Sequence, residues 1–402
     1  MPDTRHAAPG GGVVSGSKGR GRPCLQNPVS VLRDARGRGV IAGWLTVPVI
    51  DCALILELPT PSAIGGGGWV DFARGLQLHA ENQALIYGRQ DVGLTPEESW
   101  PRYAEPHASI RIFAVRNQDK IVARGYYDLE RGAEPTAWLY VDVDPAWRHR
   151  GLGSAMAGRL HDIADADGVR KVIVYAPSTT GPGAQVTPTS GSGSLPAGNS
   201  EVRFLLGAGY QLEQVRRASA LTLPKDASSL LAEASLAGGD NYRVHFWMNR
   251  TPDPWRSDMA ILRQQMGRSA PTAGLDEPEE VWTVQRLIES EVRLSDGTRD
   301  FLTAAVEDRA TRQLVGFTTL AVPTDKDRPV NQEDTLVLSG HRGHRLGKLL
   351  KVANLDHLQR ERPGHPVVIT FNAEENHHML AVNDSLGFTS FGHEGAWRLG
   401  LT

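Results

Sequence analysis

Cysteine is scarce in this chain of 402 residues, which contains only Cys24 and Cys52. Two cysteines without a CxxC spacing cannot form a disulfide framework or a cysteine-rich zinc site, so we expect a protein of a reducing compartment, the cytoplasm. An excess of one charge is also lacking, because 43 Lys and Arg stand against 46 Asp and Glu and leave a formal net charge of -3. This balance provides no electrostatic basis for binding nucleic acid.

A long uninterrupted hydrophobic run is missing as well. The most apolar stretch, 39–58, is interrupted by Pro48 and Asp51, and its last residues are typical of a β-strand, so we expect no membrane insertion. Residues 1–50 open with seven Lys or Arg, two Asp and clusters of glycine within the first 40 positions. This composition predicts a disordered basic extension.

One short pattern occurs twice, with Arg148 and Arg342 at matching places. In each copy an apolar, β-branched run meets a basic turn that contains glycine, and a helical pattern follows at once. Backbone N–H groups at a helix N-terminus lack an intrahelical partner and, together with the helix dipole, attract anions. Glycine allows a bulky diphosphate to approach the main chain. We therefore interpret both turns as diphosphate cradles.

A repeat this long exceeds any solenoid unit and predicts two copies of one domain, at 53–223 and 240–402. The elements follow the same order in both copies, which predicts an α/β (α+β) fold with a mostly antiparallel sheet flanked by helices in each domain. The expected helices include 69–87, about 153–167, 278–294 and about 347–360, and the expected strands include 110–115, 120–127, 302–307, 314–322 and 367–371.

Residues 177–200 contain no charged side chain and are rich in Gly, Ser, Thr and Pro. The second domain is shorter at this point, because 56 positions separate Gly153 from Gly209 but only 40 separate Gly347 from Gly387. Since the stretch has little to bury, we expect a flexible insertion that folding does not require.

The first copy resembles motif A of the GCN5-related N-acetyltransferase (GNAT) superfamily. That motif consists of a strand, V-x-P, R-x-x-G-x-G and a helix, and it is matched here by Val143, Pro145, Arg148, Gly151 and Gly153. The layout from about 53 to 402 is similar to that of tandem acetyltransferases of this superfamily.

The second copy is a less regular match. Arg342 and Gly347 agree with motif A, but Arg345 stands at the middle glycine and Ser339 at the proline. Residues 376–388 resemble motif B of the superfamily, in which an asparagine opens the loop, here Asn376. Which half is catalytic stays open, because the first keeps the better diphosphate loop and the second keeps the better motif B and a carboxylate near the expected base position. The resemblance to a tandem acetyltransferase that uses its second half favours the second, and we expect the first half to bind CoA or to act as a scaffold.

The resemblance implies acetyl-CoA as cosubstrate and a primary amine of a small molecule or peptide as acceptor, with direct attack of the amine on the thioester. It implies that the strand before each cradle pairs with the pantetheine amides and that the cradle binds the diphosphate. The implied cofactor-binding residues are Val141, Asp142, Val143, Arg148, His149, Arg150, Gly151, Leu152, Gly153 and Ser154 in the first copy, and Thr335, Leu336, Val337, Arg342, Gly343, His344, Arg345, Leu346, Gly347, Lys348 and Asn376 in the second.

The chain departs from the family at the acid and base positions. Leu205 and Asn383 stand where a tyrosine often protonates the leaving thiolate, and Ala137 and Asn331 stand where a glutamate often serves as base. The nearest carboxylates in the second copy are Glu333 and Asp334, which we take as catalytic candidates. A solvated strand end explains the same two residues without any catalytic role.

Two other interpretations stay open at this point. The missing tyrosine and glutamates are consistent with a CoA-binding sensor or scaffold that has lost catalysis, and a longer acyl chain could replace acetyl. The histidines near the second cradle have no cysteine partner or HExxH spacing, so we expect no metal site. These histidines are His341, His344, His377 and His378.

Overall fold

The computed structural model describes residues 54–104, 109–132, 134–226, 231–232, 239–269, 271–278, 281–295 and 298–401. These residues belong to one compact unit that spans 47–402. The expected extension at 1–50 lies outside the described residues. Among the helices described, none is long and apolar enough to cross a membrane.

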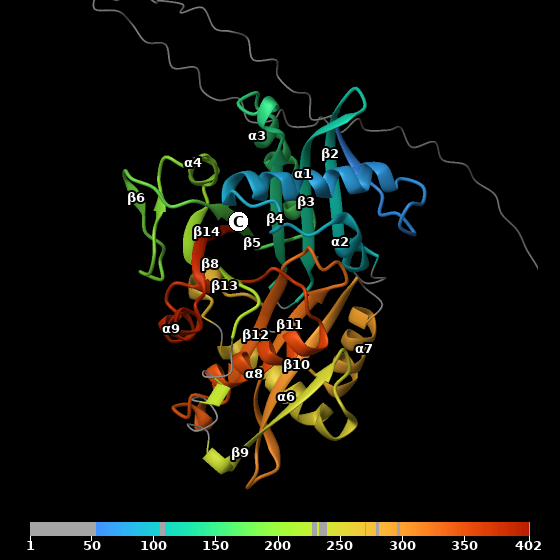
Figure 1. The fold of residues 1–402 in the computed structure, drawn as a ribbon. Helices are drawn as coiled ribbons and strands as arrows, with labels where there is room; N and C mark the ends of the chain where they lie inside the picture. Colours follow the sequence, from blue (N-terminus) through green and yellow to red (C-terminus); the bar gives the residue numbers. More distant parts are fainter. Residues whose placement is uncertain are drawn as a thin grey trace, which may run out of the picture. The chain divides into compact units, whose positions relative to one another are not determined.

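The first half begins with a strand, two helices and a three-stranded meander (Figure 1). Helix α2 starts at a capping box: the Glu98 backbone N–H donates to Thr95 Oγ1 at 3.1 Å, and the Thr95 N–H donates to the Glu98 carboxylate at 2.8 Å. The elements are β1 (Ile55–Leu58), α1 (Trp69–Tyr87), α2 (Pro96–Tyr103), β2 (Ile110–Asn117), β3 (Lys120–Glu130), β4 (Thr136–Val143), α3 (Leu152–Ala166), β5 (Lys171–Ser178), β6 (Gln185–Val186), β7 (Leu195–Pro196), α4 (Ser200–Gly207) and β8 (Gln211–Thr222).

The second half repeats this order. A 3-10 turn precedes each cradle, at Pro145–Trp147 and at Ser339–His341. The elements are β9 (Tyr242–Met248), α6 (Arg256–Ser269), α7 (Val284–Ser295), β10 (Arg299–Asp308), β11 (Gln313–Pro323), β12 (Val330–Val337), α8 (Leu346–Glu361), β13 (Val367–Ala373), α9 (His377–Leu386) and β14 (Thr389–Gly400). The predicted mixed α/β architecture is confirmed.

All the long strands form one sheet of 12 strands, in the order β1-β2-β3-β4-β5-β14-β8-β13-β12-β11-β10-β9. The last strands of the two halves are exchanged: β14 pairs with β5, β8 pairs with β13, and β8 and β14 pair with each other, all antiparallel. The sheets expected separately for the two halves are therefore joined, although we keep 53–223 and 240–402 as the proposed extents of the halves.

The sheet opens at one place in each half. The parallel pairing of β4 with β5 covers only Thr136–Trp138 against Lys171–Ile173. That of β12 with β13 covers only Val330–Asn331 against Val368–Ile369. Beyond these short ladders the strands diverge, next to the start of α3 and α8.

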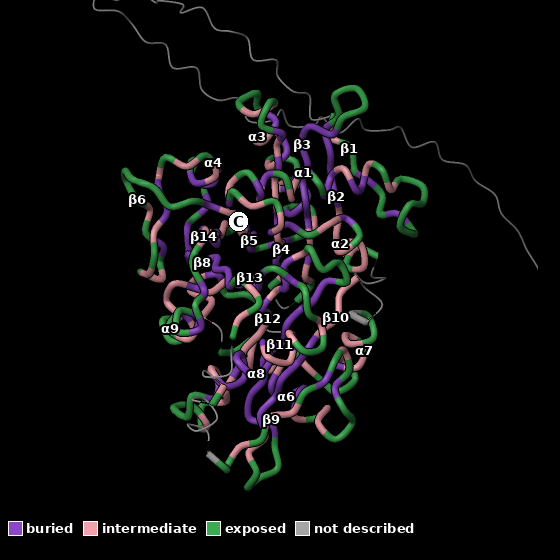
Figure 2. The backbone as a smooth tube through the Cα atoms, viewed as in Figure 1, coloured by how far each residue is buried: buried purple, intermediate pink, exposed green. Residues whose placement is uncertain are grey.

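Helices cover both faces of the sheet. Ile112 of β2 packs in a cluster with Phe72 of α1, whereas its neighbour Phe113 packs with Met156 of α3. Successive residues of a strand point to opposite faces, so α1 and α3 lie on opposite sides. Figure 2 shows the buried residues concentrated along inner strands, and in β11 every residue except Gln313 is buried.

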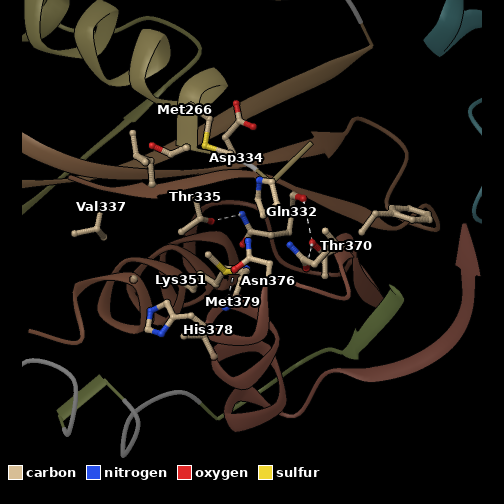
Figure 3. A pocket seen from close by; sticks show the side chains of 18 of the residues that line it. Met266, Gln332, Asp334, Thr335, Val337, Lys351, Thr370, Asn376, His378 and Met379 are labelled. Atoms are coloured by element: carbon tan, nitrogen blue, oxygen red, sulfur yellow. Dashed lines mark hydrogen bonds between the residues drawn. The ribbon is translucent and has the colours of Figure 1, made fainter. Parts of the chain in front are cut away.

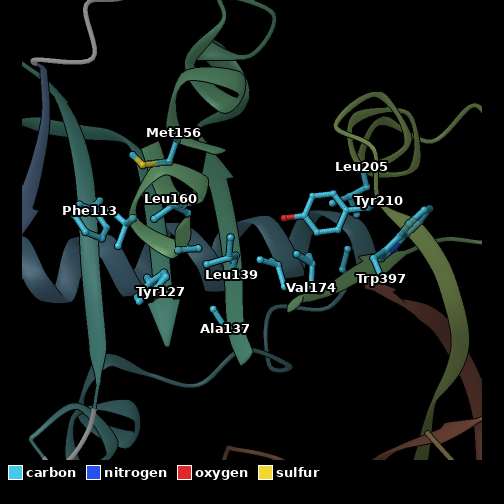
Figure 4. Close-up of a cluster of buried hydrophobic side chains, with 14 of the residues drawn as sticks. Phe113, Tyr127, Ala137, Leu139, Met156, Leu160, Val174, Leu205, Tyr210 and Trp397 are labelled. Carbon is cyan, nitrogen blue, oxygen red and sulfur yellow. The ribbon is translucent and has the colours of Figure 1, made fainter. Parts of the chain in front are cut away.

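The exchanged strand β14 contributes to the core of the first half. Trp397 is fully buried in a cluster with side chains of α3, α4 and β5, and Figure 4 shows it beside Tyr210 and Leu205. The first half therefore depends on a side chain that lies at the far end of the sequence.

The stretch 177–200 also contributes to this core. Leu195 is fully buried in the same cluster, and the backbone N–H groups of Thr189 and Ser190 donate to carbonyl oxygens of β8 at 3.1 Å. The expectation that this stretch has little to bury is wrong for Leu195, because one leucine and a few main-chain hydrogen bonds anchor it without any charge. Its flexibility stays a prediction.

We expect the Trp397→Ala variant to lower the free energy of unfolding by about 3–5 kcal/mol, because it leaves a large cavity in the first half. Chemical denaturation followed by circular dichroism should show one cooperative transition at a lower midpoint. Leu56→Ala is the control, since Leu56 is 50% exposed on β1, and should change the stability by less than about 0.5 kcal/mol. An unchanged midpoint for Trp397→Ala would contradict the exchange of strands.

Candidate active site

The two cradles have the same backbone conformation. Helix α3 is preceded by Gly151 with φ 84°, and α8 is preceded by Arg345 with φ 56°, both in the left-handed region. Two residues earlier, His149 and Gly343 are left-handed as well, with φ of 60° and 85°. Arg345 therefore adopts the conformation that favours glycine, at a cost on the order of 1 kcal/mol.

The first arginine of each cradle ties the loop to the preceding strand. Arg148 Nε donates to the Val143 carbonyl oxygen at 3.2 Å, and Arg342 Nε donates to the Val337 carbonyl oxygen at 3.2 Å. The repeated motif is thus a repeated structure, and the difference between the halves lies in what surrounds each cradle.

Side chains of α1 and α4 crowd the first cradle. Arg148 donates to Asn82 Oδ1 of α1 at 2.8 Å. The ring of Phe204 from α4 lies over Gly153, where an added Cβ would be 3.4 Å from it. The arginine that would face a diphosphate in the first half already has a partner within the protein.

Asp142 is part of the same internal network. Its carboxylate accepts from Arg124 at 2.9 Å and from Asn82 at 3.3 Å, and it lies 3.0 Å from His79 Nδ1. Burial alone would raise the pKa of Asp142, but His79, Arg124 and Asn82 hold it well below its usual range. A carboxylate with these three partners stays ionised and is a weak base.

The second cradle opens into a cleft of about 1250 Å³. The cleft lies where β12 and β13 diverge, and Figure 3 shows the side chains that reach it from β12, α8 and α9. The predicted residues that line it are Glu333, Asp334, Thr335, Leu336, Val337, Arg342, Gly343, Arg345, Leu346, Gly347, Lys348 and Asn376. His344 and the first-copy candidates from Val141 to Ser154 are not among its lining residues.

A β-bulge in β12 determines the directions in which the side chains of this strand point. Thr318 of β11 faces Thr335, and Leu320 faces Gln332, so Glu333 and Asp334 together oppose one residue. A bulge of this kind turns side chains to a new face. Gln332 Nε2 accordingly donates to Thr318 Oγ1 at 2.9 Å, and the Thr318 and Thr335 hydroxyls lie 2.7 Å apart.

The first half differs at this position. There β4 pairs with β3 residue for residue, from Thr136 opposite Glu130 to Val143 opposite Ala123. The bulge and the open cleft therefore occur together in the second half.

The two predicted catalytic carboxylates have different surroundings. Asp334 accepts from Arg263 of α6 at 2.5 Å, and Arg263 in turn lies over the rings of Phe317 and Trp282. Glu333 contacts solvent in the cleft, while the surrounding protein and the neighbouring charge of Asp334 raise its pKa. A carboxylate with a raised pKa is the better proton acceptor near neutral pH.

Sequence reasoning did not single out Lys351, which lines the cleft and is only 2% exposed. Its Nζ donates to Asn383 Oδ1 at 2.8 Å, and Asn383 Nδ2 donates to Asn372 Oδ1 at 2.7 Å. The available signal was the position of Lys351 between the buried residues Leu350 and Val352 of α8.

The far end of the cleft is built by the first half. Arg216 of β8 donates to Glu394 at 3.0 Å and lies over the ring of Tyr175, 5.1 Å from its centroid. Trp138 of β4 and Gln214 of β8 line the same end. Residues of the first half line this cleft because β8 pairs with β13 of the second half.

Comparisons with known proteins agree with this architecture. Residues 79–184 match the acetyltransferase (GNAT) family. A mycothiol acetyltransferase from Sanguibacter keddieii is 27% identical over 303 residues, which cover 73% of this chain and 83% of the relative.

Two solved structures share the fold. A tandem GNAT protein from the clavulanic acid biosynthesis pathway has a TM-score of 0.66 at 24% identity, over 86% of this chain and 98% of that chain. A GCN5-related N-acetyltransferase from Sphaerobacter thermophilus has a TM-score of 0.58 at 15% identity, over 86% and 95%. Residues 79–184 are therefore similar to the GNAT family, and the fold of the chain as a whole is that of a tandem GNAT structure.

We expect Gly347→Val to weaken the binding of CoA by about tenfold or more, a loss of about 1.4 kcal/mol. A Cβ at Gly347 meets no protein atom within 4 Å, so the fold should tolerate the side chain, which would instead occupy the space of a diphosphate. Isothermal titration calorimetry measures the affinity, and the melting temperature reports the fold.

Gly158→Val on α3 is the matched control, because a Cβ at Gly158 also meets no protein atom within 4 Å but lies away from the second cradle. It should bind CoA with wild-type affinity. Equal affinity of Gly347→Val and the wild type would exclude the second cradle as the diphosphate site.

Proposed function

We propose that this chain is an N-acetyltransferase that moves the acetyl group of acetyl-CoA to a primary amine of a small molecule or peptide, in the cleft of the second half. The observation that carries this proposal is one cleft that contains an open cradle, a bulged strand and the carboxylate of Glu333. The relative named as a mycothiol acetyltransferase supports acetyl transfer as the chemistry.

The cofactor would lie between the cradle and the open edge of β12. Backbone N–H groups at the start of α8, with Arg342 and Lys348, suit a diphosphate. The main chain of Thr335–Val337 suits the amides of pantetheine, because the ladder between β12 and β13 has ended before this point. The crowded first cradle favours a scaffold role for the first half.

The acceptor would enter from the end of the cleft that β8 lines. Glu333 takes the proton from the substrate ammonium, directly or through a water molecule, and the free amine then attacks the thioester carbonyl carbon. Asp334 acts as a positioning residue, because its ion pair with Arg263 of α6 holds the bulge in place. The carboxylates of Glu333 and Glu277 in the cleft favour a cationic acceptor.

We expect Glu333→Gln to lower the turnover of acetyl-CoA by roughly 10²-fold or more, since it removes the proton acceptor. The affinity for CoA should stay the same. Because the pKa of Glu333 is raised, its carboxylate is lost as the pH falls through that value, so kcat/KM of the wild type should decline toward low pH. The loss in Glu333→Gln should shrink toward high pH, where the amine deprotonates by itself.

Thiol release in the presence of a panel of primary amines is the measurement. Glu361→Gln, at the exposed end of α8, is the control and should keep full turnover. Full turnover by Glu333→Gln would remove Glu333 from the mechanism. A wild type that binds CoA but acetylates no amine in the panel would favour a CoA sensor instead.

A further inference from the structure

Lys351 is a buried cation inside the proposed cofactor cleft. Helix α8 starts at the second cradle, and Lys351 lies about one turn beyond Lys348, on the side that faces α9. Figure 3 shows it near Asn376 and Met379, on the side of β12 that carries Thr335 and away from Asp334. The amine therefore lies inward of the diphosphate site, where the reactive end of a bound thioester would be.

The partners of this amine are uncharged. Asn383 Oδ1 accepts its hydrogen bond at 2.8 Å, Asn372 fixes the orientation of Asn383, and the ring of Phe388 lies 5.8 Å from Nζ. In the described part of the chain, no carboxylate forms an ion pair with it. The titratable side chains on the elements packed against α8 are Tyr242, Arg243 and His245 of β9, Arg299, Asp300, Glu307 and Asp308 of β10, Glu333 and Asp334 of β12, and His377, His378 and Asp384 of α9.

This arrangement is costly for a purely structural lysine. Burying an ammonium without an opposite charge opposes folding, and a methionine would fill the same volume without that penalty. An unpaired cation in a cleft is instead suited to stabilise a negative charge that appears during a reaction.

We propose that Lys351 is the catalytic acid that protonates the sulfur of CoA as it leaves, an inference that rests on the proposed acetyl transfer. Asn383 acts as its positioning residue. Asn383 stands where many relatives of the superfamily carry a tyrosine for this step, so the lysine of the neighbouring helix would replace that hydroxyl.

The step balances in atoms and charge. The amine nitrogen forms a bond to the carbonyl carbon, the carbon–sulfur bond breaks, and its electron pair goes to sulfur. The ammonium of Lys351 then gives a proton to the thiolate and becomes a neutral amine, which still donates to Asn383. The nitrogen of the new amide bond loses its second proton to solvent in the cleft, and solvent returns a proton to Lys351.

Burial lowers the pKa of Lys351 to about 7. An ordinary thiol has a pKa of about 8.5, so transfer of the proton from the ammonium to the thiolate is favourable.

The test measures the ionisation of the CoA thiol on the full-length protein. CoA labelled with ¹³C next to sulfur is bound to the protein, and its NMR shift is followed against pH. In the wild type, the nearby ammonium should lower the pKa of the bound thiol by about 1 unit, to a value that is still above the pKa of Lys351. In Lys351→Met this decrease should disappear, and kcat should fall roughly 10²-fold with little change in KM for acetyl-CoA.

Lys348→Met is the matched control, because it removes the same charge one turn earlier on α8. It should weaken CoA binding and leave the pKa of the bound thiol as low as in the wild type. A bound thiol with the same pKa in the wild type and in Lys351→Met would overturn the role of Lys351 while leaving acetyl transfer intact.

If Lys351→Met does not fold, the thiol pKa measured on the wild type alone still tests the proposal. An unshifted thiol pKa in CoA bound to the wild type overturns the proposal for Lys351. A wild type that does not bind CoA overturns both this inference and the proposed function, so the two failures are distinguishable.

Discussion

The antiparallel pairing of β8 with β14 is the contact on which both halves depend. Each strand ends one half of the sequence but completes the sheet of the other, because β14 pairs with β5 and β8 pairs with β13. An inner strand without its neighbour would leave a row of buried N–H and C=O groups unpaired, at a cost of about 1–3 kcal/mol each. Neither half is therefore self-sufficient, and Trp397 lies in the core of the opposite half.

The two cradles have different surroundings. Both loops have left-handed residues at the same two positions. In the first half, Asn82 takes the hydrogen bond of Arg148, and Phe204 covers Gly153. In the second half, the cleft stays open and receives Arg216 from the first. We therefore propose that the first cradle contributes to the stability of the fold and that the second one binds the ligand.

The proposed chemistry relies on two titratable groups with opposite environments. Glu333 is a carboxylate whose pKa is raised by the surrounding protein and by Asp334, and Lys351 is an amine whose pKa is lowered by burial. Both shifts bring the pKa values closer to neutral pH. Glu333 can then act as the proton acceptor and Lys351 as the proton donor. Asp334, the other carboxylate of the bulge, is paired with Arg263 and takes no part in the proposed proton transfer.

Local features were readable from the sequence, because periodicity, caps and turns depend on neighbouring residues. The helix at 69–87, the strand at 367–371 and both cradle turns follow from such signals, even though Arg345 replaces a glycine. Contacts between distant residues were not readable. The partner strand of β8, the closing of the first cradle and the pairing of Lys351 with Asn383 were decided by the tertiary structure, because they depend on which surfaces meet when the chain is packed.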